Sequence, residues 1–169
     1  MIITHGDLAW TRRRFKNKKI VYCSGSFDLP HLGHALLFKK CKSLGDILVV
    51  NVGCDYDISQ SKPGRPIMPQ LIRLRTVNEF RSVDFCFLGK RLLKSQNSQA
   101  RVVEIFKSLQ PDIYAVNDDA SDMTYRRQVA EECGVKLVVL KPVHPVGYPE
   151  FSATWIVEKI TRITRKALK

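Results

Sequence analysis

The chain has no long hydrophobic run. No stretch of its 169 residues approaches the roughly 18 uninterrupted apolar residues that a membrane-spanning helix needs. Its first residues, MIITHGDLAW, include an acidic side chain and lack the apolar segment of a signal peptide. We therefore expect a soluble protein that has no signal peptide and makes no membrane contact.

Paired cysteines are missing as well. The five cysteines are an odd number, are scattered along the chain and form no C-x-x-C pair. They are Cys23, Cys41, Cys54, Cys86 and Cys133. This pattern argues against a disulfide framework and against a zinc site, and it is typical of reduced thiols in a cytoplasmic protein.

Acidic residues are few compared with basic ones. Lysine and arginine number 28 against 16 aspartates and glutamates, which gives a net charge of +12. The excess gathers in TRRRFKNKK near the start and in KITRITRKALK at the end. Such a balance favours an anionic partner: nucleic acid, a phosphorylated metabolite or a nucleotide. The same clusters also fit solvated ends of a neutral core. Nucleic-acid binding is the weaker hypothesis, because no recognition motif or aromatic-rich basic surface supports it.

Internal repeats, low-complexity tracts and interdomain linkers are also absent. The strands are predicted at 19–24, 46–53, 83–88, 112–117 and 135–140, and the helices at 31–45, 70–82, 98–109, 125–134 and 152–168. Residues 54–69 are rich in Gly, Pro and Ser, and we expect a long loop there that can act as a lid.

This alternation predicts an α/β fold. We expect a Rossmann-like, doubly wound, mostly parallel five-stranded sheet with helices on both faces. The length suits one domain over residues 1–169, with its core at about 19–160 and basic extensions at both ends.

The stretch GSFDLPHLGH, residues 25–34, fills the first turn from strand to helix, where doubly wound sheets favour phosphates. Gly25 permits a close backbone approach, and the N–H groups at the helix start suit an anion. His31 and His34 lie three residues apart, so both imidazoles can project toward one ligand. Gly33 leaves room for a base or phosphate against the backbone.

Other readings of this stretch are weaker. Neither G-x-G-x-x-G nor G-x-x-x-x-G-K-[ST] occurs in it. Two histidines alone do not make a metal site, since a carboxylate or third histidine would also be needed. A single histidine could merely cap the helix or sit in the core. The combination of residues in this position favours a ligand site.

GSFDLPHLGH closely resembles the G-[ST]-F-D-x-x-H-x-G-H motif of the nucleotidyltransferases that share the H-x-G-H signature, a superfamily that includes class I aminoacyl-tRNA synthetases. The resemblance covers about residues 19–160, with SKPGRPIMPQLIR, EFRSVD, AVNDDA and FSATWIVEKI matching later segments in order. It is greatest to the heptose-phosphate adenylyltransferases and glycerol-3-phosphate cytidylyltransferases. SKPGRP is similar to the K-M-S-K-S loop of the synthetases, but the chain leaves no room for an anticodon-binding domain.

The resemblance implies transfer of a nucleoside monophosphate from a nucleoside triphosphate to a phosphorylated sugar or polyol, by direct in-line attack with release of pyrophosphate. ATP is favoured as the donor, and CTP with glycerol 3-phosphate is the alternative. Mg²⁺ is expected on the phosphates, held mainly by the substrate. Three roles are open to Asp28: orienting the site, approaching the metal or contacting the acceptor. Small members of the family are often homodimers, which implies the same here.

The resemblance also assigns site residues. The catalytic ones are His31, His34, Lys62 and Arg65; those for the nucleotide are Gly25, Ser26, Phe27, Gly33, His34, Asp118, Ser152 and Thr154; those for the acceptor are Asp28, Arg73, Arg81 and Asp119. Several have a plainer alternative: solvated charges for the lysine and arginines, and a helix cap for Asp118 and Asp119. Ser152 and Thr154 cap the last helix under either interpretation.

Four departures from the family pattern concern specificity. Val157 stands where many members carry arginine, which fits the heptose-phosphate type, and Ala153 replaces a hydroxyl residue and so removes one phosphate donor. Both also fit a binding module without chemistry. HPVGYPEF lacks an arginine usual in cytidylyltransferases, whereas Arg81 favours them. Asn117 replaces a glycine in NDD and alters how the base or acceptor is read.

Overall fold

Five parallel strands form the centre of the protein. The computed structural model describes residues 1–91, 98–120, 122–141, 146–147 and 151–168. The strands are β1 (Ile20–Gly25), β2 (Ile47–Val52), β3 (Phe85–Leu88), β4 (Ile113–Asn117) and β5 (Lys136–Leu140). They pair in the order β3-β2-β1-β4-β5, and every pair is parallel. The predicted doubly wound α/β fold is thereby confirmed.

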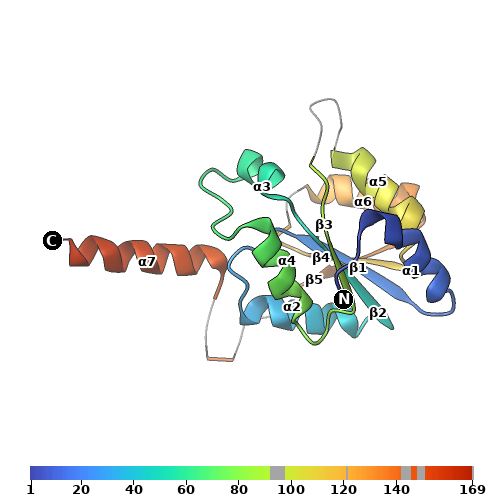
Figure 1. Cartoon of the computed structure of the whole chain (residues 1–169), viewed down its shortest axis with the longest axis horizontal. Coiled ribbons are helices and arrows are strands. Elements are labelled where there is room, and N and C mark those ends of the chain that lie inside the picture. The colour runs from blue at the N-terminus through green and yellow to red at the C-terminus, as the bar shows by residue number, and fades with distance from the viewer. Residues whose placement is uncertain (92–97, 121, 142–145, 148–150, 169) are drawn as a thin grey trace.

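Helices cover both faces of the sheet (Figure 1). Helices α2 (Leu32–Lys42) and α4 (Gln70–Asn78) pack on one face, while α1 (Leu8–Arg14), α5 (Ser98–Leu109) and α6 (Met123–Glu132) pack on the other. Successive side chains of a strand point to opposite faces, so each strand supplies both cores. On β1, Tyr22 packs with α5 and α6, while Val21 and Cys23 pack with α2 and α4.

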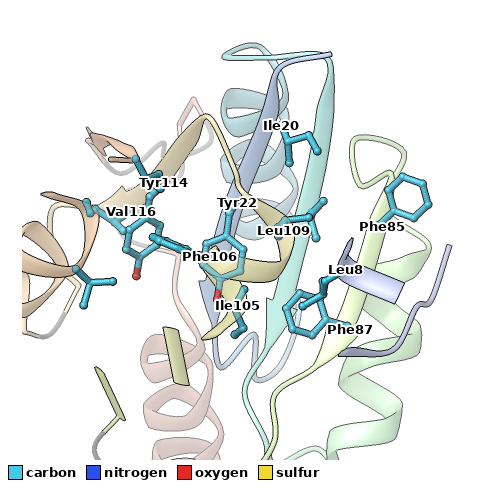
Figure 2. Packing of buried hydrophobic residues seen from close by; sticks show 14 of the residues in the cluster. Leu8, Ile20, Tyr22, Phe85, Phe87, Ile105, Phe106, Leu109, Tyr114 and Val116 are labelled. Carbon is cyan, nitrogen blue, oxygen red and sulfur yellow. The ribbon is translucent and has the colours of Figure 1, made fainter. Parts of the chain in front are cut away.

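Aromatic side chains dominate the core beneath α5. Figure 2 shows Tyr22, Phe106 and Tyr114 gathered beside Ile105 and Leu109. The rings of Tyr22 and Phe106 meet edge to face with centroids 5.3 Å apart, and Phe106 and Tyr114 do the same at 5.3 Å. Aromatic pairs in this arrangement contribute roughly 0.5–1.5 kcal/mol beyond their buried area. This core fixes β1 and β4 side by side.

The N-terminal segment packs against the sheet. The Ile3 amide donates to the Cys86 carbonyl at 2.9 Å, and a short 3-10 turn, η1 (His5–Asp7), leads into α1. Leu8 is buried in the core. Arg12 donates to the carbonyls of Phe15, Lys18 and Gln110, so part of the N-terminal basic cluster holds the chain together.

The segment predicted as one long loop contains a helix. Helix α3 (Asp55–Ser61) occupies much of it, so the loop prediction is wrong for those residues. Two acidic side chains in its first turn, Asp55 and Asp57, suit the positive end of the helix, and Ile58 is buried. Only residues 62–69 form the connection to α4. That helix ends at Asn78, earlier than predicted, and the chain turns there toward β3.

The last helix, α7 (Ala153–Ala167), projects away from the body of the protein (Figure 1). Ser152 caps its start, because the Trp155 amide donates to the serine Oγ at 3.1 Å. The helix is exposed along its length, with basic side chains near its end. Within the described ranges, no helix combines the length and hydrophobicity needed to cross a membrane.

Candidate active site

A cavity of about 360 Å³ opens at the carboxyl end of the sheet. Three groups of residues form its walls. The helix-end wall is made by His31, Gly33, His34 and residues 151–154, at the starts of α2 and α7; the loop wall by Ile58, Lys62 and Arg65; and the strand-end wall by Asn117, Asp119 and Lys141. Ligands of doubly wound sheets bind at this end of the strands, beside the strand where the winding direction reverses. The location therefore fits a substrate site.

Backbone donors fix both histidines of the helix-end wall. His31 caps α2, and its Nδ1 accepts the Gly33 N–H at 3.1 Å. The His34 Nδ1 in turn accepts the His31 N–H at 3.3 Å. A nitrogen that accepts a hydrogen bond carries no proton, so each neutral imidazole has its proton on Nε2. Both rings line the cavity, where each can donate one hydrogen bond from Nε2.

The two imidazoles are neutral at physiological pH. Burial, together with the nearby His31, lowers the pKa of His34 to about 3, while Asp28 opposes the shift. Burial also lowers the pKa of His31. The ring centroids are 4.1 Å apart, so charging both would place like charges in contact. The pair therefore acts through hydrogen bonds in the ligand-free protein.

Gly33 and Gly25 make room for neighbouring rings. A Cβ on Gly33 would lie 2.8 Å from the His31 Cε1, so the space predicted for a base or phosphate belongs to the His31 ring. A Cβ on Gly25 would lie 2.9 Å from the Phe27 ring. Phe27 has a left-handed backbone (φ 46°) and packs edge to face against His34. Gly25 and Phe27 do not line the cavity; they lie behind the histidines.

Asp28 holds the loop wall in place. Its Oδ2 accepts the Ile67 N–H at 2.9 Å and pairs with the Arg65 Nη1 at 2.8 Å. Its Oδ1 accepts the N–H groups of Met68 at 3.0 Å and Leu29 at 3.1 Å. Of the three roles considered for this carboxylate, orienting the site is the one these contacts display.

The structure does not bring Arg73 to the cavity. The Arg73 side chain is fully buried, and its guanidinium donates to the carbonyls of Ser26, Gly53 and Met68 and to the Asp55 carboxylate. These hydrogen bonds connect the turn between β1 and α2 to the residues that follow β2 and to the end of the loop at 62–69. Arg73 thus supports the site from behind, and its donors are already engaged.

Two other predicted residues also lie outside the cavity lining. Arg81 is exposed in the turn after α4. Asp118 is exposed, and its amide donates to the Leu140 carbonyl at 3.0 Å. Asp122 occupies the N-cap position of α6, so neither Asp118 nor Asp119 caps that helix. The remaining predicted site residues line the cavity: Ser26, Asp28, His31, Gly33, His34, Lys62, Arg65, Asp119, Ser152 and Thr154.

Comparison with known proteins decides the family. A family model described as cytidylyltransferase-like matches residues 22–159. The chain belongs to the cytidylyltransferase-like family. The bifunctional protein HldE of Desulfatibacillum aliphaticivorans is 30% identical over 87% of this chain and 28% of the relative. The FAD synthase of Methanothrix thermoacetophila is 36% identical over 84% of this chain and 93% of the relative.

Solved structures agree with this cytidylyltransferase-like assignment. The lipopolysaccharide core biosynthesis protein of Thermoplasma volcanium shares 27% identity and a TM-score of 0.59, over 76% of this chain and 98% of that one. The pantoate-beta-alanine ligase of Francisella tularensis, at 17% identity and a TM-score of 0.58, shares the fold. This chain covers only 28% of the length of one HldE relative and 21% of the length of another. The predicted nucleotidyltransferase, and hence an enzyme, is confirmed.

Some cavity residues of this cytidylyltransferase-like enzyme were not predicted as site residues. Lys141 follows strand β5 and was not expected at the site, whereas Asn117, which ends β4, was expected to alter how the base or acceptor is read. The position at a strand end was the available signal for Lys141, since parallel strands end at one edge of the sheet. Phe151 packs edge to face on His31, with ring centroids 5.5 Å apart, and so joins the starts of α7 and α2. Most of HPVGYPEF, noted for its missing arginine, lies outside the described residues.

The carboxylates of the site suit a metal ion carried by the substrate. Across the described part of the chain, no three His, Cys, Asp or Glu side chains gather as a metal site. Asp28 is committed to the loop, whereas Asp119 lines the cavity and has no hydrogen bond or ion pair within the described ranges. Mg²⁺ in nucleotide sites takes one or two carboxylates plus phosphate oxygens. A metal ion held mainly by the phosphate oxygens of the substrate is compatible with this donor set.

Proposed function

We propose that this enzyme transfers AMP from ATP to the phosphate of a phosphorylated sugar or polyol and releases pyrophosphate. The observation that carries the proposal is the histidine pair, whose Nδ1 atoms are held by backbone N–H groups so that both Nε2–H donors serve the cavity. An uncharged pair of fixed donors suits phosphoryl oxygens on which charge grows during transfer.

The reaction needs little covalent chemistry from the protein. A lone pair of the acceptor phosphate attacks the α-phosphorus of ATP, a new P–O–P linkage forms, and the bond to the bridging oxygen breaks as pyrophosphate leaves with the electron pair. No proton has to be removed from a phosphate dianion. The work left to the enzyme is alignment and charge stabilisation.

The walls of the cavity suit these tasks. His31 and His34 donate to the triphosphate, and the N-termini of α2 and α7 add backbone donors. Lys62 and Arg65 bring positive charge from the loop wall. Mg²⁺, when bound, would neutralise phosphate charge, with the phosphate oxygens as its main ligands.

Pyrophosphate release tests the proposal. The enzyme is incubated with Mg²⁺, each of the four NTPs and a panel of sugar 1-phosphates, glycerol 3-phosphate and FMN. ATP with at least one acceptor should release pyrophosphate in equal amount to the new product. Activity only with CTP and glycerol 3-phosphate would support the cytidylyl alternative. If no NTP binds even at millimolar concentration, the proposal fails.

FMN is a second candidate acceptor. The Methanothrix FAD synthase is matched over 93% of its length at 36% identity, whereas the HldE match spans 28% of that relative. FMN is itself a polyol phosphate, so the attacking atom is the same. Chromatography of the product separates the two cases: FAD would form from FMN, and a nucleoside diphosphate sugar from a sugar phosphate.

A further inference from the structure

Strand β4 places an asparagine with an unpaired amide oxygen in the wall of the cavity. Asn117 is the last residue of β4 and lines the strand-end wall. Its side-chain Oδ1 is buried and has no hydrogen-bond partner among the described residues. Buried polar atoms in folded proteins are nearly always paired, so an exception at a ligand cavity points to a partner supplied by the ligand. The missing partner must be a donor.

The rest of the cavity shows which part of a nucleotide lies there. The helix-end and loop walls present donors and cations, namely the Nε2–H groups, Lys62 and Arg65, which suit phosphates. The strand-end wall instead combines the Lys141 ammonium with two acceptors, the exposed Asp119 carboxylate and the covered amide oxygen of Asn117. Acceptors repel phosphate oxygens and attract N–H and O–H groups. A nucleotide with its phosphates on the first two walls therefore places its nucleoside on the third.

We propose that Asn117 selects the nucleobase by accepting a hydrogen bond from its exocyclic amino group. Adenine carries such a group at C6 and cytosine at C4, whereas guanine and uracil carry carbonyl oxygens at those positions. The Cβ–Cγ torsion of asparagine is soft, so a modest rotation turns the covered oxygen toward an arriving amine. This inference rests on the proposed function only in requiring that a nucleoside triphosphate binds.

Equilibrium binding with matched nucleotides tests the inference. ATP is compared with purine riboside triphosphate, which lacks only the amino group, and CTP is compared with UTP, all with Mg²⁺, by calorimetry. The wild-type enzyme should prefer the amino-bearing member of at least one pair by about tenfold or more. Asn117→Ala should bind both members equally, while Asn117→Asp, with an oxygen at both terminal positions, should keep the preference.

Controls separate the possible outcomes. Asn17→Ala, an exposed asparagine in the turn before β1, should retain the wild-type preference. Unchanged melting temperatures establish that the Asn117 variants fold. Nucleotide binding with a preference that survives Asn117→Ala, or with no preference in either pair, overturns this inference and leaves the proposed function standing. Absence of all nucleotide binding overturns both.

Discussion

The helix-end wall and the strand-end wall of the cavity are built by different means. In the helix-end wall, backbone N–H groups hold both imidazoles, and Gly33 admits the His31 ring at close range. In the strand-end wall, single side chains at the ends of β4 and β5 face the cavity, and the Asn117 oxygen and Asp119 carboxylate have no partner in the described structure. In the proposed function, the first wall binds the phosphates through fixed donors, and the second binds the nucleoside through single side chains. Reaction class and substrate choice would then depend on separate parts of the molecule.

The largest effect should follow from breaking the helix-end wall. Replacing His34 with alanine removes an oriented donor, and we expect the rate of nucleotidyl transfer to fall by about 10²-fold or more. The matched control is His5→Ala, because the wild-type His5 ring contacts the Leu88 carbonyl. That variant should retain its rate. A His34→Ala enzyme within threefold of the wild type would instead favour a binding module in which the histidine does no chemistry.

The same wall should set the acid stability of the fold. His34 has a pKa of about 3 in the folded protein, below its ordinary value of 6.5. Between these two pH values the imidazole is protonated in the unfolded chain and neutral in the folded one. The stabilisation from neutral His34 is complete above pH 6.5 and declines as pH falls toward 3. By pH 5 the loss is about 2 kcal/mol.

Urea unfolding at several pH values measures this effect. Wild type and His34→Gln are compared between pH 8 and 5, because glutamine does not titrate. The free energy of unfolding should fall more steeply with acid in the wild type than in the variant. Parallel curves would show that His34 titrates normally and is not desolvated.

A third change separates cavity support from general stability. Asp28 and Asp112 each pair with an arginine and accept backbone N–H groups, Asp28 at the cavity and Asp112 with Arg12 and Ile20 at the amino end of the sheet. Asp28→Asn should raise the KM for the nucleotide about tenfold, because Arg65 and the loop lose their anchor. Asp112→Asn should lower the melting temperature and leave KM unchanged. Equal KM effects would remove the distinction.

The smallest effect concerns the start of α7. Ser152→Ala removes the acceptor of the Trp155 N–H, which typically costs about 1 kcal/mol of helix stability. We expect a few-fold weaker nucleotide binding, since α7 begins in the cavity. Ser43 is the control residue, because its hydroxyl donates to the Lys40 carbonyl at the far end of α2. The Ser43→Ala variant should bind the nucleotide as the wild type does.

Much of the fold and of the helix-end wall could be predicted from the sequence. Short apolar runs such as ILVVNV mark buried parallel strands, and GSFDLPHLGH fixes a local backbone that places both histidines. Local patterns suffice there because the contacts that matter are close in sequence, as between His31 and Gly33.

The remaining features depend on contacts between distant segments. Arg73 was predicted at the acceptor, yet its partners Ser26 and Gly53 reach it only in the folded chain. Helix α3 is stabilised from outside, because Gln70 and Arg73 bind Asp55. Likewise, nothing in the letters NDD shows that the Asn117 oxygen lacks a partner. Long-range pairing decides each of these cases.

The central claim is that both imidazoles present Nε2–H donors to a triphosphate. Nitrogen-15 NMR of the histidine side chains at pH 7 tests it most directly, with His31→Gln and His34→Gln used for assignment. Both rings should be neutral with the proton on Nε2, and adding ATP with Mg²⁺ should shift the Nε2 signals of both. Protons on Nδ1, or unchanged Nε2 signals while ATP is bound, would contradict the account.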